Sequence, residues 1–467
     1  MKPIEKYSDI ANIEERKAAD YALDKAIKEG ATESRVMLNM GEQSSFNVLD
    51  GELDILQGSA DRSLYIQIYI NGKYGSYSTN IFKKSSLDTF IKNAVEATKL
   101  LSEDYAYTLP DKSLYYKGFD GCTVEEGLKK TDLGQFDPMI YSLSPAQKRE
   151  IALEVYNKMD EVSYRGNKTG ALISGSVEYA DSVEYFYMKD SQEFKGESLQ
   201  TTFNLTSEVS VKGRNGARPE SWWYESTLTL NDFLNNVNYR DTGTTALYRA
   251  QAKLNPKKIK GGTYSVVIDR TCSSRVIAPV LSALSGANLQ QKNSFLLDCL
   301  GKRVFSPKMS LIDRPLLKGM SGSRYFDSEG VATADMDIIS GGRVEKYFIN
   351  TYYSKKLGMP AGVEGASVPI LTDGGDIADS GELIKLVGRG VFITGFNGGN
   401  CNPGTGDFSF GIEGFYFESG EIKFPVKELN ITGNIISLWN NFIASANDAR
   451  KCTRWQIGSL AFENVNI

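Results

Sequence analysis

The sequence predicts an α+β fold: an N-terminal antiparallel sheet with packed helices, followed by a mainly β C-terminal domain with one apolar helix. Three helical patterns and two hairpin signals in the first half of the chain indicate the sheet and its helices, and glycine-spaced strand patterns fill most of the second half. The 467 residues are enough for two or three domains, each with its own core. Hydrophobic residues at 41% and charged residues at 24% exclude a disordered or fibrous chain.

The first element is an amphipathic helix over residues 19–27, where alanine, leucine and isoleucine recur at helical spacing and Gly30 follows as a C-cap. From Val36 to Thr79 the pattern changes to short alternating runs. Asp50-Gly51 and Asn71-Gly72 interrupt these runs, and both pairs are typical of two-residue hairpin turns. We therefore expect an antiparallel meander.

A second helix is predicted after Ser85 and Ser86, which we take as its caps, because apolar residues over 87–95 share one face. The third helix is predicted from Ser144-Pro145, where Gln147 completes a capping box, to about Met159. Both helices should pack on the sheet. Strands then resume, with the clearest alternation between Phe203 and Val211.

A domain boundary is expected near residue 258, because Asn255-Pro256 ends a polar, helix-compatible segment and a lysine- and glycine-rich stretch follows it. The predicted domains are an N-terminal α+β domain over residues 1–258 and a mainly β domain over residues 259–467. The second domain should begin with a strand over 264–269 and an apolar helix over 274–285.

The net charge and the apolar pattern limit the classes of partner that we expect for this protein. The formal net charge of −5 gives no cationic surplus for a phosphate backbone, so direct nucleic-acid binding is not expected. The N-terminal residues lack an apolar signal region and no run of 18 apolar residues occurs, so we expect a cytoplasmic protein without membrane contact. The widely spaced cysteines should be reduced thiols: Cys122, Cys272, Cys299, Cys401 and Cys452.

The chain contains no histidine, which excludes Ser-His-Asp and Cys-His triads and every histidine-containing zinc site. A hydrolase acting alone would then need a cysteine nucleophile, Cys401 or Cys452. Its thiolate would require a cationic environment, and Arg450 and Lys451 directly precede Cys452. This cysteine-dependent hydrolase is one alternative for the function.

Two further segments could carry a site. The glycine-rich window from Gly395 to Gly411 lets backbone approach backbone or ligand closely, and it is interpreted either as a substrate-facing turn between two strands or as a structural loop. No lysine or helix follows it as a phosphate-binding loop would require. Asp327 and Glu329 could be paired carboxylates for acid-base chemistry, but a polar turn before a strand is the favoured interpretation.

Several motifs, in this order along nearly the whole chain, resemble the TldD/PmbA protease family, and in particular its PmbA/TldE branch. These are Glu29-Gly-Ala-Thr-Glu-Ser-Arg35, Gly51-Glu-Leu-Asp54, Asn71-Gly-Lys-Tyr-Gly-Ser-Tyr-Ser-Thr79, Ser294-Phe-Leu-Leu-Asp-Cys-Leu-Gly-Lys302, Phe326-Asp-Ser-Glu-Gly-Val-Ala-Thr333, Lys355-Lys-Leu-Gly358 and Pro403-Gly-Thr-Gly-Asp-Phe-Ser-Phe-Gly411.

In the TldD branch, as the resemblance implies, H-E-x-x-x-H on the first helix of the C-terminal domain holds zinc together with a late cysteine. The matching helix here reads Ile277-Ala-Pro-Val-Leu-Ser282, so Ile277, Ala278 and Ser282 stand at the motif positions. None of the three is a zinc ligand or a base. Cys452 lies near the position of the late cysteine and is a candidate ligand. We expect no catalytic residue, metal or cofactor in this chain, and zinc in a TldD-type partner.

The resemblance implies a non-catalytic subunit that forms a heterodimer with a TldD-type subunit, or a homodimer with itself, and acts on unfolded or extended peptides. The family label "modulator of DNA gyrase" would then describe an indirect effect through proteolysis. A homo-oligomeric peptide-binding protein without a protease partner is a further alternative. The candidate peptide-binding residues come from the glycine-rich window: Gly398, Gly399, Asn400, Cys401 and Asp407.

Overall fold

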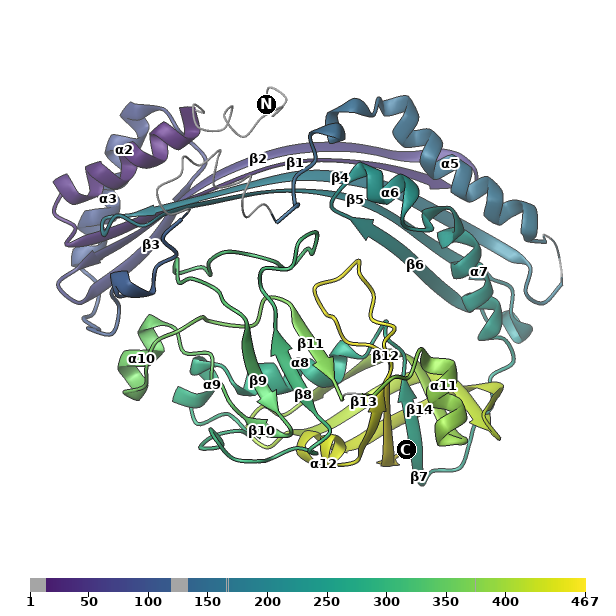
Figure 1. Cartoon of the computed structure of the whole chain (residues 1–467). Coiled ribbons are helices and arrows are strands. Elements are labelled where there is room, and N and C mark those ends of the chain that lie inside the picture. Colours follow the sequence, from purple (N-terminus) through teal and green to yellow (C-terminus); the bar gives the residue numbers. More distant parts are fainter. Residues whose placement is uncertain (1–13, 119–132, 165, 167, 374) are drawn as a thin grey trace.

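In the computed structural model a long curved sheet arches over a second, mainly β part of the molecule (Figure 1). The structure describes residues 14–118, 133–164, 166, 168–373 and 375–467, and Cys122 lies outside these residues. Within the described chain the arch has six strands in the order β3-β2-β1-β4-β5-β6, and all of its pairings are antiparallel. The predicted α+β class and the N-terminal antiparallel sheet are confirmed.

The elements of the first part alternate between strands of the arch and helices that cover it. They are α2 (Glu14–Lys28), β1 (Glu33–Leu49), β2 (Glu52–Ile70), β3 (Lys73–Thr79), α3 (Lys84–Lys99), α5 (Pro145–Val162), β4 (Leu172–Asp190), β5 (Lys195–Val211), β6 (Glu220–Thr227), α6 (Leu230–Asn235) and α7 (Thr242–Ala252). Helices α2 and α3 lie at one end of the arch, and α5, α6 and α7 lie at the other (Figure 1).

The hairpin turns form where the sequence predicts them. Asp50 and Gly51 join β1 to β2 with φ values of 49° and 91°, and Asn71 and Gly72 join β2 to β3 with 47° and 80°. Two successive positive φ values match the right-handed twist of the flanking strands, which is why Asn-Gly and Asp-Gly pairs are favoured there. The strands are longer than the short runs expected from the sequence: β1 has 17 residues and β2 has 19, because their pairing continues through polar residues between the apolar runs.

Helix α5 has the predicted capping box, in which Ser144 accepts from the Gln147 N–H and the Gln147 side chain accepts from the Ser144 N–H. The predicted caps of α3 are wrong. Ser85 and Ser86 lie inside its first turn, and the N-cap is Lys83, which makes no side-chain capping bond. The first turn is closed instead by the Lys83 carbonyl, which accepts from the N–H groups of Ser86 and Leu87 at 2.9 and 3.0 Å.

The second part contains a six-stranded sheet in the order β14-β13-β12-β7-β16-β15, which an additional pairing between β14 and β16 closes into a barrel, and a smaller sheet in the order β10-β9-β8-β11. Its elements are β7 (Thr263–Ile268), α8 (Ser274–Ala283), α9 (Gly286–Gln290), β8 (Ser310–Asp313), β9 (Met336–Ser340), β10 (Arg343–Val344), α10 (Thr351–Leu357), β11 (Pro369–Thr372), α11 (Ser380–Val387), β12 (Arg389–Cys401), β13 (Asp407–Glu418), β14 (Glu421–Asn434), α12 (Ile435–Asn440), β15 (Phe442–Ser445) and β16 (Leu460–Asn466).

The predicted strand and apolar helix correspond to β7 and α8, and the mainly β character of this part is confirmed. Four short helices, α9 to α12, also lie among its described strands and were not expected from the sequence. Each has five to eight residues, too few for a helical apolar period to stand out from the strand pattern around it.

The largest buried apolar clusters are separate. One contains residues between Ala19 and Ala250, and the other contains residues between Val266 and Val465. The boundary near residue 258 stays a prediction, since separate cores do not define a domain limit by themselves. Over the described ranges, none of the helices combines the length and the apolar character that crossing a membrane requires.

Candidate functional site

Two hollows share lining residues on α8. The first has a volume of about 350 Å³ and lies between this helix and the hairpin of β12 and β13. Its walls come from both elements: Arg275, Ala278, Pro279 and Ser282 on α8, and Gly399, Asn400, Cys401, Pro403 and Phe410 on the hairpin. The structure thus brings together two groups of residues that the sequence singled out separately, the motif positions on α8 and the glycine-rich window.

The three motif positions on α8 face different environments. Ile277 is fully buried in the core of the C-terminal part. Ala278 and Ser282, which are four residues apart and therefore share a helix face, line the first hollow. This face presents a methyl group and a hydroxyl group to the hollow, and neither is a strong metal ligand or a general base at neutral pH.

Gly399 shapes the hairpin wall of the first hollow. Its φ is +85°, and a Cβ at this position would overlap the carbonyl oxygen of Ser409 on β13. The register of β12 against β13 shifts between Phe396 and Gly399, so the glycine lies in a bulge. Gly398 beside it has φ +126°. The window therefore contains the bulged end of β12, a turn over residues 402–406 and the start of β13, and its substrate-facing role stays a prediction.

Arg275 connects α8 to this bulge. Its Nη2 donates to the carbonyl oxygen of Gly399 at 2.8 Å, and its guanidinium lies 4.7 Å from the ring centre of Phe410. Burial raises the pKa of the nearby Cys401 thiol, the Asp407 charge acts in the same direction, and Arg275 opposes them. The Cys401 thiol is therefore less readily ionised than a free cysteine.

Asp407 stabilises the hairpin turn instead of lining either hollow. Its carboxylate accepts from the Thr405 hydroxyl at 2.8 Å and from the Asn434 amide at 2.9 Å. These two hydrogen bonds hold the pKa of Asp407 below its usual range. Of the five candidate peptide-binding residues, Gly399, Asn400 and Cys401 line the first hollow and Gly398 lines the second.

The second hollow, of about 560 Å³, lies between the two parts of the molecule. It shares Arg275 and Ala278 with the first, so the two form one groove along α8. The remaining lining residues come from β6, α7 and its C-cap, the turn before α8 and its first residue, β12 and β13: Ser221, Trp222, Trp223, Arg249, Lys253, Thr271, Cys272, Ser274, Thr394, Gly395, Phe396, Gly398 and Glu413.

Sequence reasoning missed the cationic and aromatic side of this groove. The sequence analysis singled out neither the aromatic residues of this side, Trp222 and Trp223, nor its cationic residues, Arg249, Lys253 and Arg275. Adjacent tryptophans are a usable signal in the sequence, because successive side chains of a strand point to opposite faces. One of the two rings is then exposed if the strand has a solvent face, and Trp222 on β6 is 54% exposed. The arginines carry no such signal, since only the tertiary fold brings residues of α7 and α8 to one hollow.

Cys452 lies in the segment between β15 and β16 and is not among the residues that line either hollow. Burial raises the pKa of its thiol, and Arg450 opposes this shift. Arg450 also lies 4.3 Å from the ring centres of both Trp223 and Tyr224, so this segment is docked against β6. Among the described residues, no group of three thiol or carboxylate side chains is close enough to hold a metal ion.

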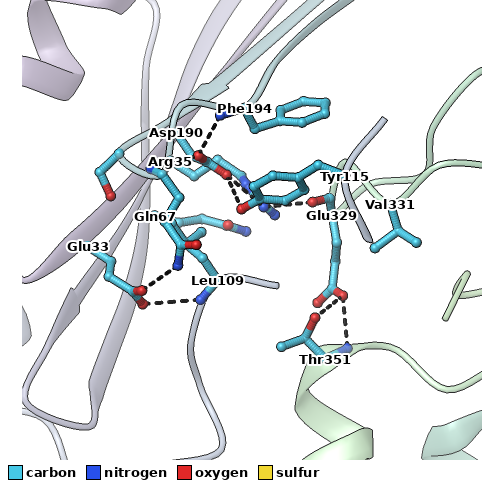
Figure 2. A network of polar contacts seen from close by, with 12 residues as sticks. Glu33, Arg35, Gln67, Leu109, Tyr115, Asp190, Phe194, Glu329, Val331 and Thr351 are labelled. Carbon is cyan, nitrogen blue, oxygen red and sulfur yellow. Dashed lines mark hydrogen bonds and ion pairs between the residues drawn. The ribbon is translucent and has the colours of Figure 1, made fainter. Parts of the chain in front are cut away.

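The C-terminal part contacts the arch at Glu329, whose backbone lies beside Arg35 (Figure 2). Arg35 on β1 pairs with Asp190 on β4 at 3.2 Å and donates to the carbonyl oxygen of Glu329 at 2.7 Å. The Tyr115 hydroxyl donates to the same carboxylate of Asp190 at 2.6 Å. The ion pair between Arg35 and Asp190 is therefore buried at the junction of the two parts.

Asp327 and Glu329 are not a carboxylate pair for acid-base chemistry. The Asp327 carboxylate accepts from the N–H groups of Glu329 and Val331 at 2.9 and 3.0 Å. Glu329 turns the other way and accepts from the Thr351 N–H and hydroxyl at 2.9 and 2.7 Å, at the start of α10 (Figure 2). The favoured interpretation of a polar turn agrees with these contacts, and the turn also joins the two parts.

Comparison with known proteins agrees with this architecture. The model of the PmbA/TldA metallopeptidase C-terminal domain matches residues 261–467, and that of PmbA/TldA metallopeptidase domain 1 matches residues 35–98. The chain is 28% identical to the metalloprotease PmbA homolog of Haemophilus influenzae, over 100% of this chain and 99% of that protein.

Solved structures show the same fold over nearly the whole chain. The crystal structure of a candidate modulator of DNA gyrase from Bacteroides thetaiotaomicron is 40% identical, with a TM-score of 0.89 over 97% of this chain and 98% of that one. TldE from Thermococcus kodakarensis is 17% identical, with a TM-score of 0.75 over 96% of this chain and 99% of that one.

An arched antiparallel sheet docked on a barrel-containing part, with a groove along the first helix of that part, defines a two-part protein with a metallopeptidase-type C-terminal domain. The chain belongs to the PmbA/TldD family. The resemblance inferred from the motifs is confirmed.

Proposed function

We propose that this chain is a non-catalytic, PmbA/TldE-type subunit that acts with a zinc-bearing TldD-type subunit on unfolded or extended peptides. The observation that carries the proposal is the groove face of α8. There Ala278 and Ser282 stand at positions of the zinc motif, in a chain without histidine whose residues 261–467 match a metallopeptidase domain.

The residues of the groove do not fit a catalytic zinc ion. Such a site needs three protein ligands among imidazole, thiolate and carboxylate groups, and an open position for water. On α8 the three motif positions supply an alkyl chain, a methyl group and a hydroxyl group, and among the described residues no three thiol or carboxylate side chains lie close enough to share a metal ion. We therefore assign the zinc and the hydrolytic water to the partner subunit, and no catalytic step to this chain.

The edge of β12 supports a role in holding peptide. β12 pairs with β7 only from Val391 to Ile393, and the described residues provide no further strand on that edge from Thr394 to Cys401. Both hollows of the groove lie along this stretch. An extended peptide can add to this edge through backbone hydrogen bonds, although the two register shifts of β12 interrupt a regular ladder and the Gly399 carbonyl oxygen already accepts from Arg275.

A cysteine-dependent hydrolase is not favoured. A nucleophilic thiolate needs a pKa lowered by cations or a helix N-terminus. Burial instead raises the pKa of both Cys401 and Cys452, although an arginine opposes the shift in each case.

We also infer that any effect on DNA gyrase, the activity named for the Bacteroides relative, is indirect and follows from proteolysis in the cytoplasm. The net charge of −5 disfavours direct contact with DNA. A gel shift with duplex DNA at low salt is the check, and tight, salt-sensitive binding would contradict this part of the proposal.

The test is cleavage of a fluorescent unfolded peptide by this chain alone, by the TldD-type subunit of the same source alone, and by both together, with and without a zinc chelator. The proposal expects chelator-sensitive cleavage that requires the mixture. Chelator-resistant cleavage by this chain alone would overturn it. Peptide binding without any effect on cleavage would favour the alternative, a homo-oligomeric peptide-binding protein.

A further inference from the structure

The groove contains more positive than negative charge. Arg249, Lys253 and Arg275 line the second hollow, and Glu413 is the one carboxylate among its lining residues. Lys253 and Glu413 form an ion pair at 2.9 Å and so compensate each other. Over the described part of the chain, neither Arg249 nor Arg275 has a carboxylate within ion-pair distance. Two cationic charges in the hollow are thus left without counter-charge.

Both arginines are held in place by aromatic rings rather than by carboxylates. The guanidinium of Arg249 lies 5.0 Å from the ring centre of Trp223, and that of Arg275 lies 4.7 Å from the ring centre of Phe410. Arg275 uses one donor for the Gly399 carbonyl oxygen. A guanidinium has five N–H donors in one plane, so a stacked arginine keeps its edge free for a planar, bidentate acceptor.

The two arginines come from different parts of the molecule and line the same hollow. Arg249 comes from α7 in the arch, and Arg275 comes from the first turns of α8 in the C-terminal part. The free edge of β12, through Thr394, Gly395 and Gly398, runs along the same hollow. A peptide added to this edge therefore has its side chains or its end beside two uncompensated guanidinium groups.

From this juxtaposition we infer a carboxylate-binding subsite formed by Arg249 and Arg275. It accepts either an acidic side chain or the C-terminal carboxylate of an extended peptide. The inference rests on the proposed peptide-holding function and adds the chemical class of the ligand. Arg–carboxylate pairs are short, bidentate and charge-assisted, so this subsite selects peptides by charge while the β12 edge binds any backbone.

The test measures the binding of labelled unfolded peptides by fluorescence anisotropy, to this chain alone and to its mixture with the TldD-type subunit in the presence of a chelator. Four peptides of matched sequence are compared. Two carry acidic side chains, Asp and Glu, and two carry their neutral counterparts, Asn and Gln. Within each pair, one peptide has a free C-terminus and the other an amidated C-terminus. The acidic-side-chain and free-terminus arms distinguish the two sources of the carboxylate. We expect one of them to bind about tenfold tighter than its neutral match at low salt, and the difference to shrink as salt rises.

Substitutions assign the effect to the subsite. Arg249→Gln and Arg275→Gln should each reduce the preference, the double variant should abolish it, and Arg275→Lys, which keeps the charge but loses the planar fork, should fall in between. Arg343→Gln is the matched control, because this exposed arginine lies on β10 away from both hollows. Thermal unfolding of each variant verifies its folding.

The outcomes separate the two proposals. Equal binding of acidic and neutral peptides, or an unchanged preference in the double variant, overturns the carboxylate subsite and leaves peptide binding intact. Failure of every peptide to bind, to the chain and to the mixture, overturns both the subsite and the peptide-holding role.

Discussion

Arg35 joins the arch to the C-terminal part through buried contacts. Its guanidinium reaches Asp190 within the sheet and the Glu329 carbonyl oxygen across the junction, and its Nε has no hydrogen-bond partner among the described residues (Figure 2). Both side chains of the ion pair are at most 3% exposed. Removing one charge of such a pair is costly because the other remains buried without compensation.

Arg35→Met is therefore expected to lower the free energy of unfolding by about 3 kcal/mol or more. The Asp190 carboxylate would keep the donors from Tyr115 and Phe194 but lose its counter-charge. Denaturant unfolding at pH 7 measures the loss. Arg62→Met is the matched control, since Arg62 is 56% exposed in its pair with Glu15 and should cost less than about 1 kcal/mol. Equal losses in the two variants would contradict this role of Arg35.

Asp327 makes the free energy of unfolding fall as pH rises, which is the opposite of the usual effect of an aspartate. Burial, together with the nearby Glu364 charge, raises the pKa of its carboxyl to about 6. The folded state then holds the proton more tightly than the unfolded chain, whose aspartates titrate near 3.9. The contribution of Asp327 to the free energy of unfolding is therefore largest below pH 4 and falls as pH rises towards 6.

We expect the free energy of unfolding of the natural chain, taken relative to Asp327→Asn, to be about 1 kcal/mol larger at pH 5 than at pH 7. Asparagine does not titrate. Any difference between the two proteins in how the free energy of unfolding changes with pH therefore comes from Asp327. Denaturant titrations of both proteins at several pH values supply the numbers. A difference that stays constant, or that grows as pH rises, would show that the pKa of Asp327 is not raised.

At the scale of elements, the hairpin of β12 and β13 depends on the glycine bulge beside α8. Gly399 combines a positive φ with close contact to the Ser409 backbone, and its carbonyl oxygen accepts from Arg275. A side chain at this position would force the two strands apart. The same movement would displace Arg275 and widen the first hollow.

Gly399→Ala should therefore destabilise the protein by about 2 kcal/mol and weaken peptide binding. Gly362→Ala is the control, because Gly362 has no positive φ and open space around its Cβ position, and it should change stability by less than about 0.5 kcal/mol. Thermal unfolding and anisotropy binding report the two effects. A Gly399→Ala variant as stable as the control would mean that the bulge tolerates a side chain.

Elements whose signal is local could be predicted from the sequence. Asp50-Gly51 and Asn71-Gly72 form the expected turns, and Ser144 forms the expected capping box, because each depends only on neighbouring residues. The full length of β1 and β2 could not be predicted, since polar residues within them stay in strand through pairing with distant residues. The short helices α9 to α12 also lack a local signal.

At the scale of the whole molecule, the groove results from docking one part on the other. Trp223 and Arg249 come from the arch, and Arg275 comes from the C-terminal part. The sequence could identify the motif positions on α8 and the glycine-rich window. It could not show that the two face each other, or that Asp407 serves the turn, because contacts between distant segments follow from tertiary packing.

The central claim is that this chain acts as a subunit without a zinc site of its own. Native mass spectrometry, with zinc determined on the same samples, tests it on this chain alone and on its complex with the TldD-type subunit of the same source. We predict no bound zinc on the chain alone, and one zinc ion in a complex with one copy of each subunit, lost on chelation together with cleavage activity. Stoichiometric zinc on this chain alone, or two zinc ions in the one-to-one complex, would contradict the claim.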